Sequence, residues 1–201
     1  MTPPRPLSPK EVETLLLELA PSNYYGYAAR AAVRNKLIAL LMLEAGCRTR
    51  EVTRLWVQHA YWQGQPREQL EIPDTIAKYH IGGLIPIPPR LRACLIEYLP
   101  LWHPPDRHNP TNYLIYHTTG ADPLSCRQIH RILSTAAASA IPGHFHPHML
   151  RHTFADRLRQ VTDVATAMRL LRHRHLSSTQ VYFHSSDREM ATAMSRAFPQ
   201  P

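Results

Sequence analysis

The stretch that decides the fold is residues 146–155, which read HPHMLRHTFA. His148, Arg151 and His152 stand together at the start of a predicted helix. Neither a plain hydrophobic core nor a plain solvated surface requires two histidines and an arginine at these positions. The stretch therefore predicts a functional centre built on the first turns of a helix.

Other polar residues stand at similar places elsewhere in the chain. Arg48 directly follows Gly46-Cys47, where the predicted end of a helix falls. Lys78 ends a predicted strand before a tight turn, and His173 closes another predicted helix. Tyr182 is the only tyrosine after Tyr116. These residues are candidates for one shared site.

Taken together, these segments resemble the tyrosine recombinases, also called the phage-integrase family. Residues 46–51, GCRTRE, resemble the family's first arginine box, and residues 148–155 resemble its His-x-x-Arg box. Residues 171–182 resemble the closing box, in which the nucleophile follows the histidine by nine positions. Lys78 falls where the family keeps a hairpin lysine. The resemblance extends over residues 8–185, so it covers nearly the whole chain.

The resemblance implies a chemistry that these residue types can perform. Tyr182 would attack a DNA phosphate and form a 3′-phosphotyrosyl link, since a phenol ionises more readily than a serine hydroxyl. Arg48 and Arg151 would neutralise the charge that develops on the non-bridging oxygens. Lys78 is the predicted general acid, and His148 and His173 would contact the phosphate. Glu51 and His152 would support these catalytic residues. The predicted DNA-binding residues are Arg50, Arg172 and Arg174, and no residue is predicted to bind a metal.

Two of these positions depart from the family pattern. Arg172 replaces the glycine that usually precedes the closing histidine, and we expect its side chain to reach a DNA phosphate. Arg50 stands where the family often has a small residue. Glu51 follows Arg48 by about one helical turn, so it is placed to orient that arginine or a histidine.

Charge and composition agree with a nucleic-acid partner. The chain has 23 basic and 15 acidic side chains, a net charge of +8 and a pI near 9.8. Such a balance favours a polyanion. The longest apolar run, residues 37–43, is too short to span a membrane. The start of the chain has no secretory h-region, and the three cysteines form no C-x-x-C pair. We therefore expect a cytoplasmic, nucleoid-associated protein in a reducing compartment. We expect its cysteines to be small buried side chains.

The predicted fold class is mainly α with a small three-stranded antiparallel sheet (α+β). Apolar spacing predicts helices that begin near residues 8, 28, 49, 91 and 125, with several short helices after residue 147. The predicted strands are residues 69–72, 75–78 and 84–87. We expect one catalytic domain over residues 1–201, with a flexible start at 1–7 and a tail helix at 187–201. The predicted domain lacks a separate N-terminal core-binding domain and is similar in size to the fimbrial phase-switch invertases.

Two alternatives compete with the recombinase interpretation. The first is a metallohydrolase built on a histidine cluster. His144, His146, His148 and His152 are spaced so that they can chelate zinc or nickel, but no carboxylate accompanies them and Arg151 lies among them. The second alternative is a DNA-binding regulator of the same fold that does not cut.

The resemblance implies no ATP, obligatory metal or other cofactor. Its predicted partners are double-stranded DNA, three further copies of the chain in a tetramer on paired sites, and accessory DNA-binding proteins, with no membrane partner. The tail helix can pack on its own domain or on a neighbouring subunit.

Overall fold

The computed structural model describes residues 5–20, 26–104, 109–117 and 122–173. The elements in chain order are α1 (Pro9–Leu19), α2 (Gly26–Glu44), α3 (Thr49–Val52), α4 (Val57–Ala60), β1 (Tyr61–Trp62), β2 (Gln65–Pro66), β3 (Gln69–Ile72), the 3₁₀ turn η1 (Lys78–His80), β4 (Gly83–Pro86), α5 (Pro89–Trp102), α6 (Cys126–Ala140), α7 (His148–Val161) and α8 (Val164–Leu171). The fold is mainly helical, as the sequence predicted, and the described residues also form small antiparallel sheets.

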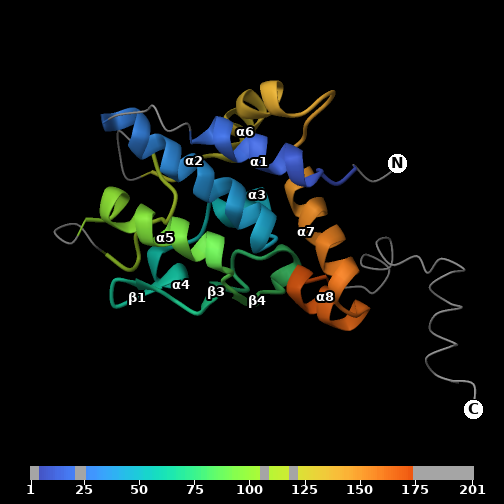
Figure 1. Ribbon diagram of the computed structural model, residues 1–201. Helices are drawn as coiled ribbons and strands as arrows, with labels where there is room; N and C mark the ends of the chain where they lie inside the picture. The colour runs from blue at the N-terminus through green and yellow to red at the C-terminus, as the bar shows by residue number, and fades with distance from the viewer. Residues whose placement is uncertain (1–4, 21–25, 105–108, 118–121, 174–201) are drawn as a thin grey trace, which may run out of the picture.

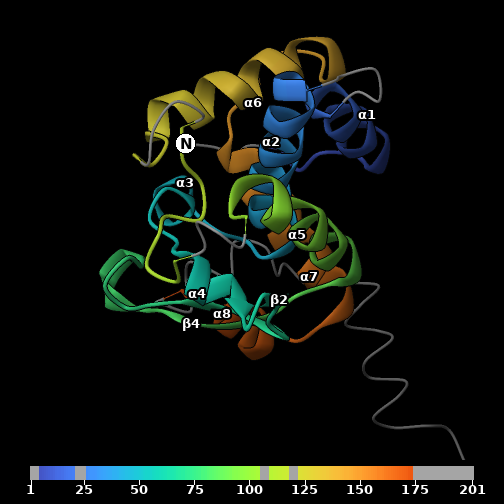
Figure 2. The same cartoon turned by 90° about the vertical axis from the view of Figure 1, so that its left-hand side faces the viewer.

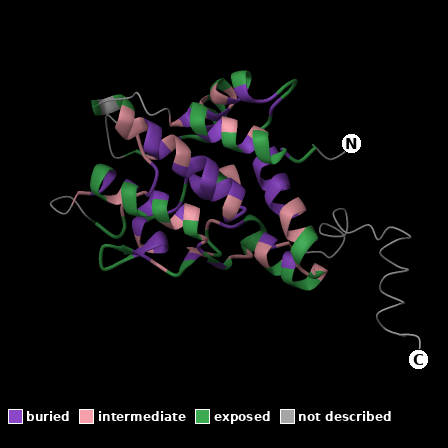
Figure 3. Cartoon of the chain, viewed as in Figure 1, coloured by how far each residue is buried: buried purple, intermediate pink, exposed green. Residues whose placement is uncertain are grey.

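Helix α2 forms the centre of the molecule. It packs against α1, α3, α5, α6 and α7, and Figures 1 and 2 show these helices arranged around it. Residues 37–43 are at most 1% exposed, so the C-terminal half of α2 is covered on every side (Figure 3). A helix that is apolar all round must be buried. Because α3 follows α2 directly, this buried rod fixes the position of the turn that carries Arg48.

Capping residues define the starts of three helices, and two of these starts, near residues 8 and 125, were predicted from the sequence. Ser8 and Glu11 form a capping box at α1, and Ser125 and Gln128 form one at α6. Asp163 accepts a hydrogen bond from the backbone N–H of Thr166 and caps α8. These local signals set the boundaries of three helices.

The predicted flexible start of the chain is wrong for residues 5–7. Leu7 is 5% exposed and belongs to the core. Its backbone N–H donates a 2.9 Å hydrogen bond to Oγ1 of Thr153 on α7, and Arg5 pairs with Glu11. Burial of Leu7 and these polar contacts hold this segment against the helix that carries Arg151.

The predicted three-stranded sheet is also wrong. The described residues contain two separate two-stranded antiparallel sheets, β1–β2 and β3–β4, and Leu70 pairs with Ile85 in the second. Residues 75–78 form a turn instead of a middle strand. The backbone N–H groups of Ile76 and Ala77 both donate to the carbonyl oxygen of Pro73, which satisfies them locally. Lys78 therefore lies in the connection between β3 and β4.

Two further findings concern the cysteines and membranes. Cys47 and Cys94 are buried as predicted, but Cys126 is exposed because it occupies the first position of α6. Over the described part of the chain, no helix is both long and apolar enough to cross a membrane.

Candidate functional site

The turn after α2 is the foundation of the site. Gly46 has φ +57°, a conformation that favours glycine. A Cβ at this position would lie 2.5 Å from Cε1 of Phe154 on α7, so the turn also requires a residue without a side chain. This close approach points the carbonyl oxygen of Gly46 toward two buried arginines.

Arg151 is one of two deeply buried cations of this centre, with 3% of its surface exposed. Nη1 donates a hydrogen bond to the carbonyl oxygen of Gly46, and Nη2 donates one to the carbonyl oxygen of Leu171. Arg151 thus joins the turn after α2 to the end of α8. Burial lowers the pKa of Arg151 to about 9, and the positive charges of Arg48 and Arg172 act in the same direction. The guanidinium is still charged at neutral pH.

Arg48 and Glu51 form a pair within one turn of α3. Nη1 of Arg48 lies 2.8 Å from Oε1 of Glu51, and the backbone N–H of Arg48 donates to Oε2 at 2.7 Å. The Glu51 side chain is 1% exposed, whereas that of Arg48 is 18% exposed. Burial on its own would raise the pKa of Glu51, but the charge of Arg172 and the contacts with Arg48 lower it below its usual range. Glu51 therefore stays ionised and holds Arg48 at the edge of the site.

Arg172 requires a correction. The sequence suggested that this side chain reaches outward to a DNA phosphate, but its guanidinium is buried. Nη2 of Arg172 lies 2.8 Å from Oε2 of Glu51 and 3.3 Å from the carbonyl oxygen of Gly46. Burying a charge without a partner is costly, and the buried guanidinium is paired with the Glu51 carboxylate. Arg172 cannot bind a phosphate on the surface in this arrangement.

The histidines lie around the arginines. His148 and His152 stand one turn apart on α7, with ring centroids 5.0 Å apart and planes at 89°. Loss of solvent, then the positive charges of Arg151 and Arg48, lowers the pKa of His173 to about 4. Desolvation, then the neighbouring His152 and Arg151, lowers the pKa of His148 as well. Both rings are neutral at pH 7, so each can donate one hydrogen bond and accept another.

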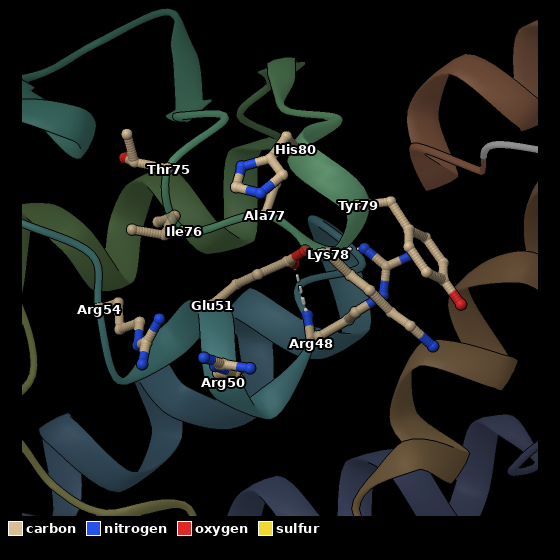
Figure 4. Close-up of a pocket in the computed structure, with 10 residues that line it drawn as sticks. All are labelled: Arg48, Arg50, Glu51, Arg54, Thr75, Ile76, Ala77, Lys78, Tyr79 and His80. Carbon is tan, nitrogen blue, oxygen red and sulfur yellow. Dashed lines mark hydrogen bonds and ion pairs between the residues drawn. The ribbon is translucent and has the colours of Figure 1, made fainter.

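Lys78 lies on the open side of the site. It is exposed and lines a pocket of about 350 Å³ together with Arg48 and Glu51 (Figure 4). The same pocket is lined by Arg50 on α3 and by Arg54 in the turn after it, and both residues are exposed. Four basic side chains around one acidic side chain favour a polyanionic ligand. Arg50 lines this pocket, and its DNA-binding role stays a prediction.

The structure brings together most, but not all, of the predicted residues. Arg48, Arg151 and His173 form one cluster, His148 and His152 adjoin it, and Lys78 lies in the adjacent pocket. Tyr182, Arg174 and the predicted tail helix lie outside the described residues.

The sequence interpretation missed the role of the Gly46 carbonyl oxygen, which accepts hydrogen bonds from Arg151 and Arg172. Gly46 was identified only as a helix terminator. Its position at the start of the arginine box, two residues before Arg48, is the signal in the sequence.

The described residues gather no set of metal ligands. Within residues 5–20, 26–104, 109–117 and 122–173, no three or more His, Cys, Asp or Glu side chains are grouped so that they could hold a metal ion. His146 and His148 are joined instead by a 3.1 Å hydrogen bond from the His148 backbone N–H to Nδ1 of His146.

The fold is that of solved DNA recombinases. XerA recombinase superposes with a TM-score of 0.70 over 98% of this chain and 65% of that chain, at 22% identity. XerH recombinase bound to its difH substrate gives a TM-score of 0.70 over 98% of this chain and 56% of that chain, at 21% identity. The Tn1549 transposon integrase in complex with circular intermediate DNA gives a TM-score of 0.72 over 96% of this chain and 67% of that chain, at 17% identity.

The sequence leads to the same class of protein. Residues 5–189 match the model of the Phage integrase family, and the chain belongs to that family. It is 27% identical to tyrosine recombinase XerC of Pseudomonas fluorescens over 174 aligned residues. This alignment covers 84% of this chain and 54% of the relative. Tyrosine recombinase XerC of Staphylococcus epidermidis is 28% identical over 95% of this chain and 60% of its own length. The chain thus spans a little more than half the length of these curated relatives.

Proposed function

We propose that this chain is a tyrosine-type site-specific DNA recombinase that cuts and rejoins DNA through Tyr182. The observation that carries the proposal is the convergence of Arg48 and Arg151 with His173 at one buried centre. Two fixed guanidiniums match the charge that a phosphodiester gains as it passes to a five-coordinate transition state. Membership of the Phage integrase family supports the same chemistry.

The proposed reaction is two transesterifications. The phenolic oxygen of Tyr182 bonds to phosphorus, and the bond from phosphorus to the 5′-oxygen breaks. Lys78 donates a proton to that leaving oxygen, and the tyrosine proton passes to a neighbouring base or to water. A 5′-hydroxyl from a second strand then displaces the tyrosine. One phosphodiester is exchanged for another, so the proposal requires no ATP, metal or other cofactor.

The proposed setting is the cytoplasm, with double-stranded DNA and three further copies of the chain as partners on paired sites. The pocket that Arg48, Arg50, Arg54 and Lys78 share supports the DNA partner. The XerH structure in complex with its difH substrate supports it by analogy.

A covalent adduct tests the proposal. Candidate sites are inverted repeats beside the gene, built as nicked duplexes that lose the 5′-hydroxyl fragment after cutting and so trap the protein on DNA. We expect an adduct that survives denaturation and forms equally well in excess chelator. An adduct that requires a divalent metal would favour a metal-dependent enzyme. Binding without any adduct would favour an inactive DNA-binding regulator.

A further inference from the structure

The backbone of Arg172 is suited to a different residue. It has φ 52° and ψ 50°, and its N–H donates to the carbonyl oxygen of Arg169 as α8 ends. This left-handed conformation is unfavourable for an arginine and favourable for a glycine. The turn itself therefore gives no reason for an arginine at this position.

The side chain of Arg172 makes contacts that a glycine cannot make. It is 1% exposed, and its Nη2 bonds both Oε2 of Glu51 and the carbonyl oxygen of Gly46. Its stem faces strand β4, because a methyl group at Gly83 would lie 3.8 Å from Cγ and Cδ of Arg172. Arg172 thus links α3 to the β3–β4 hairpin, whose connection carries Lys78.

Glu51 is shared between two arginines. Oε1 bonds Arg48, whereas Oε2 bonds both Arg172 and the backbone of Arg48. Arg48, Arg151, Arg172 and Glu51 together carry a net charge of +2, since the pKa values of His148 and His173 are lowered and both rings are neutral at pH 7. Without Arg172 the net charge would be one unit lower, and the Glu51 carboxylate would be opposed mainly by Arg48.

We propose that Arg172 is a positioning residue that neutralises Glu51, so that the charges of Arg48 and Arg151 act on the scissile phosphate. This inference rests on the proposed recombinase function. A phosphodiester with one negative charge approaches two in the five-coordinate state, so a net +2 site stabilises the transition state more than the ground state. Arg172 acts through Glu51 and does not itself contact the phosphate.

The matched variants are Arg172→Met and Arg169→Met. Methionine keeps an unbranched stem but removes the charge, and Arg169 is an exposed arginine three residues earlier on α8. We expect Arg172→Met to slow adduct formation at saturating DNA by about tenfold, less than the loss of a donor that contacts the phosphate directly. DNA affinity should change by less than about twofold, because the side chain is buried, and Arg169→Met should cut at the wild-type rate. Arg172→Gly, which relaxes the backbone, provides a second variant should the methionine variant not fold.

A neutral substrate separates an electrostatic role from a merely structural one. In a methylphosphonate, a methyl group replaces one non-bridging oxygen, so the scissile group is neutral in the ground state and carries about one negative charge, instead of two, in the five-coordinate state. If Arg172 acts through charge, its loss should cost less than about threefold on this substrate, against about tenfold on phosphate. Equal losses on both substrates would overturn the proposal, as would an Arg172→Met variant that cuts phosphate DNA at the wild-type rate.

A titration decides the role of Arg172 independently of recombination. The carboxyl carbon of Glu51 can be followed by NMR against pH in the wild type and in Arg172→Met. The proposal predicts a higher pKa of Glu51 in the variant, because the largest stabilising charge is lost. An unchanged pKa would overturn it. A wild-type chain that forms no adduct would contradict the recombinase assignment, whereas the Glu51 titration would still report whether Arg172 neutralises that carboxylate.

Discussion

Replacement of Gly46 by alanine should destabilise the chain more than the same replacement at a glycine that has a left-handed backbone but free space around its Cα. Gly46 has φ +57°, and a Cβ there would lie 2.5 Å from Cε1 of Phe154. Gly64, in the turn between β1 and β2, has φ +75° and no atom within 4 Å of a built Cβ. Gly64→Ala therefore carries the backbone strain alone, and Gly46→Ala adds a steric overlap.

The expected magnitudes follow from these two terms. Left-handed backbone costs an alanine about 1–2 kcal/mol, and forcing a methyl group into a packed site costs about 1–3 kcal/mol more. We expect Gly46→Ala to lower the free energy of unfolding by about 2–5 kcal/mol, and Gly64→Ala by about 1–2 kcal/mol. For a domain of this size, each kcal/mol lowers Tm by about 2–4 °C.

Thermal denaturation followed by circular dichroism measures the difference between the two variants. Phe154→Leu removes ring atoms, so it should restore part of the stability of Gly46→Ala although it costs stability in the wild-type background. Equal Tm losses for Gly46→Ala and Gly64→Ala would refute the packing argument. So would a double variant in which the two losses simply add.

The remaining predictions concern pH and salt. The folded-state pKa values of His148 and His173 lie below the ordinary value of 6.5, so between pH 6.5 and about 4 the unfolded chain binds more protons. The stability that these groups contribute is therefore complete above pH 6.5 and falls as the pH drops toward 4. The Tm of His173→Gln should fall less between pH 7.5 and pH 5 than the Tm of the wild type. Equal falls in Tm would contradict the lowered pKa of His173. The logarithm of the DNA-binding constant should fall linearly with the logarithm of the salt concentration, with a slope of about −0.9 for each phosphate neutralised. Fluorescence anisotropy measures this slope. A flat response would argue against a DNA-backbone interface at the pocket that Arg48 and Lys78 line.

Local signals in the sequence were enough to predict several elements. The Ser8–Glu11 pair and the N-cap Ser125 predicted the starts of α1 and α6, because a helix cap lies within four residues and depends on no distant contact. The apolar run 37–43 is too short to span a membrane. Its burial on all sides shows that it forms the centre of the core.

Features that depend on distant segments could not be predicted in this way. The turn at residues 75–78 is a local exception: these residues have the composition of a strand, but the N–H groups of Ile76 and Ala77 donate to the carbonyl oxygen of Pro73. The inward direction of Arg172 depends on Glu51, which lies 121 residues away along the chain, so spacing gives no sign of that pair. Motif likeness placed Arg172 next to the closing histidine and suggested an outward role, which burial contradicts.

The site residues were predicted from family motifs more fully than from physical pattern alone. Arg48, Arg151 and His173 lie far apart in sequence, and the structure places them around one centre. Tyr182 remains a prediction, since it lies outside the described residues. Its role is therefore the point at which the proposed mechanism is most open to refutation.

The most direct test of the mechanism is to identify the residue that carries DNA after cutting. The adduct trapped on a nicked substrate is digested with protease and nuclease, and the peptide that retains a nucleotide is sequenced by mass spectrometry. The proposed mechanism predicts a single modified residue, Tyr182, linked through a 3′-phosphate, and no modified peptide from Tyr182→Phe, which should still bind DNA. A nucleotide on any other side chain, or an adduct that persists in Tyr182→Phe, would contradict it.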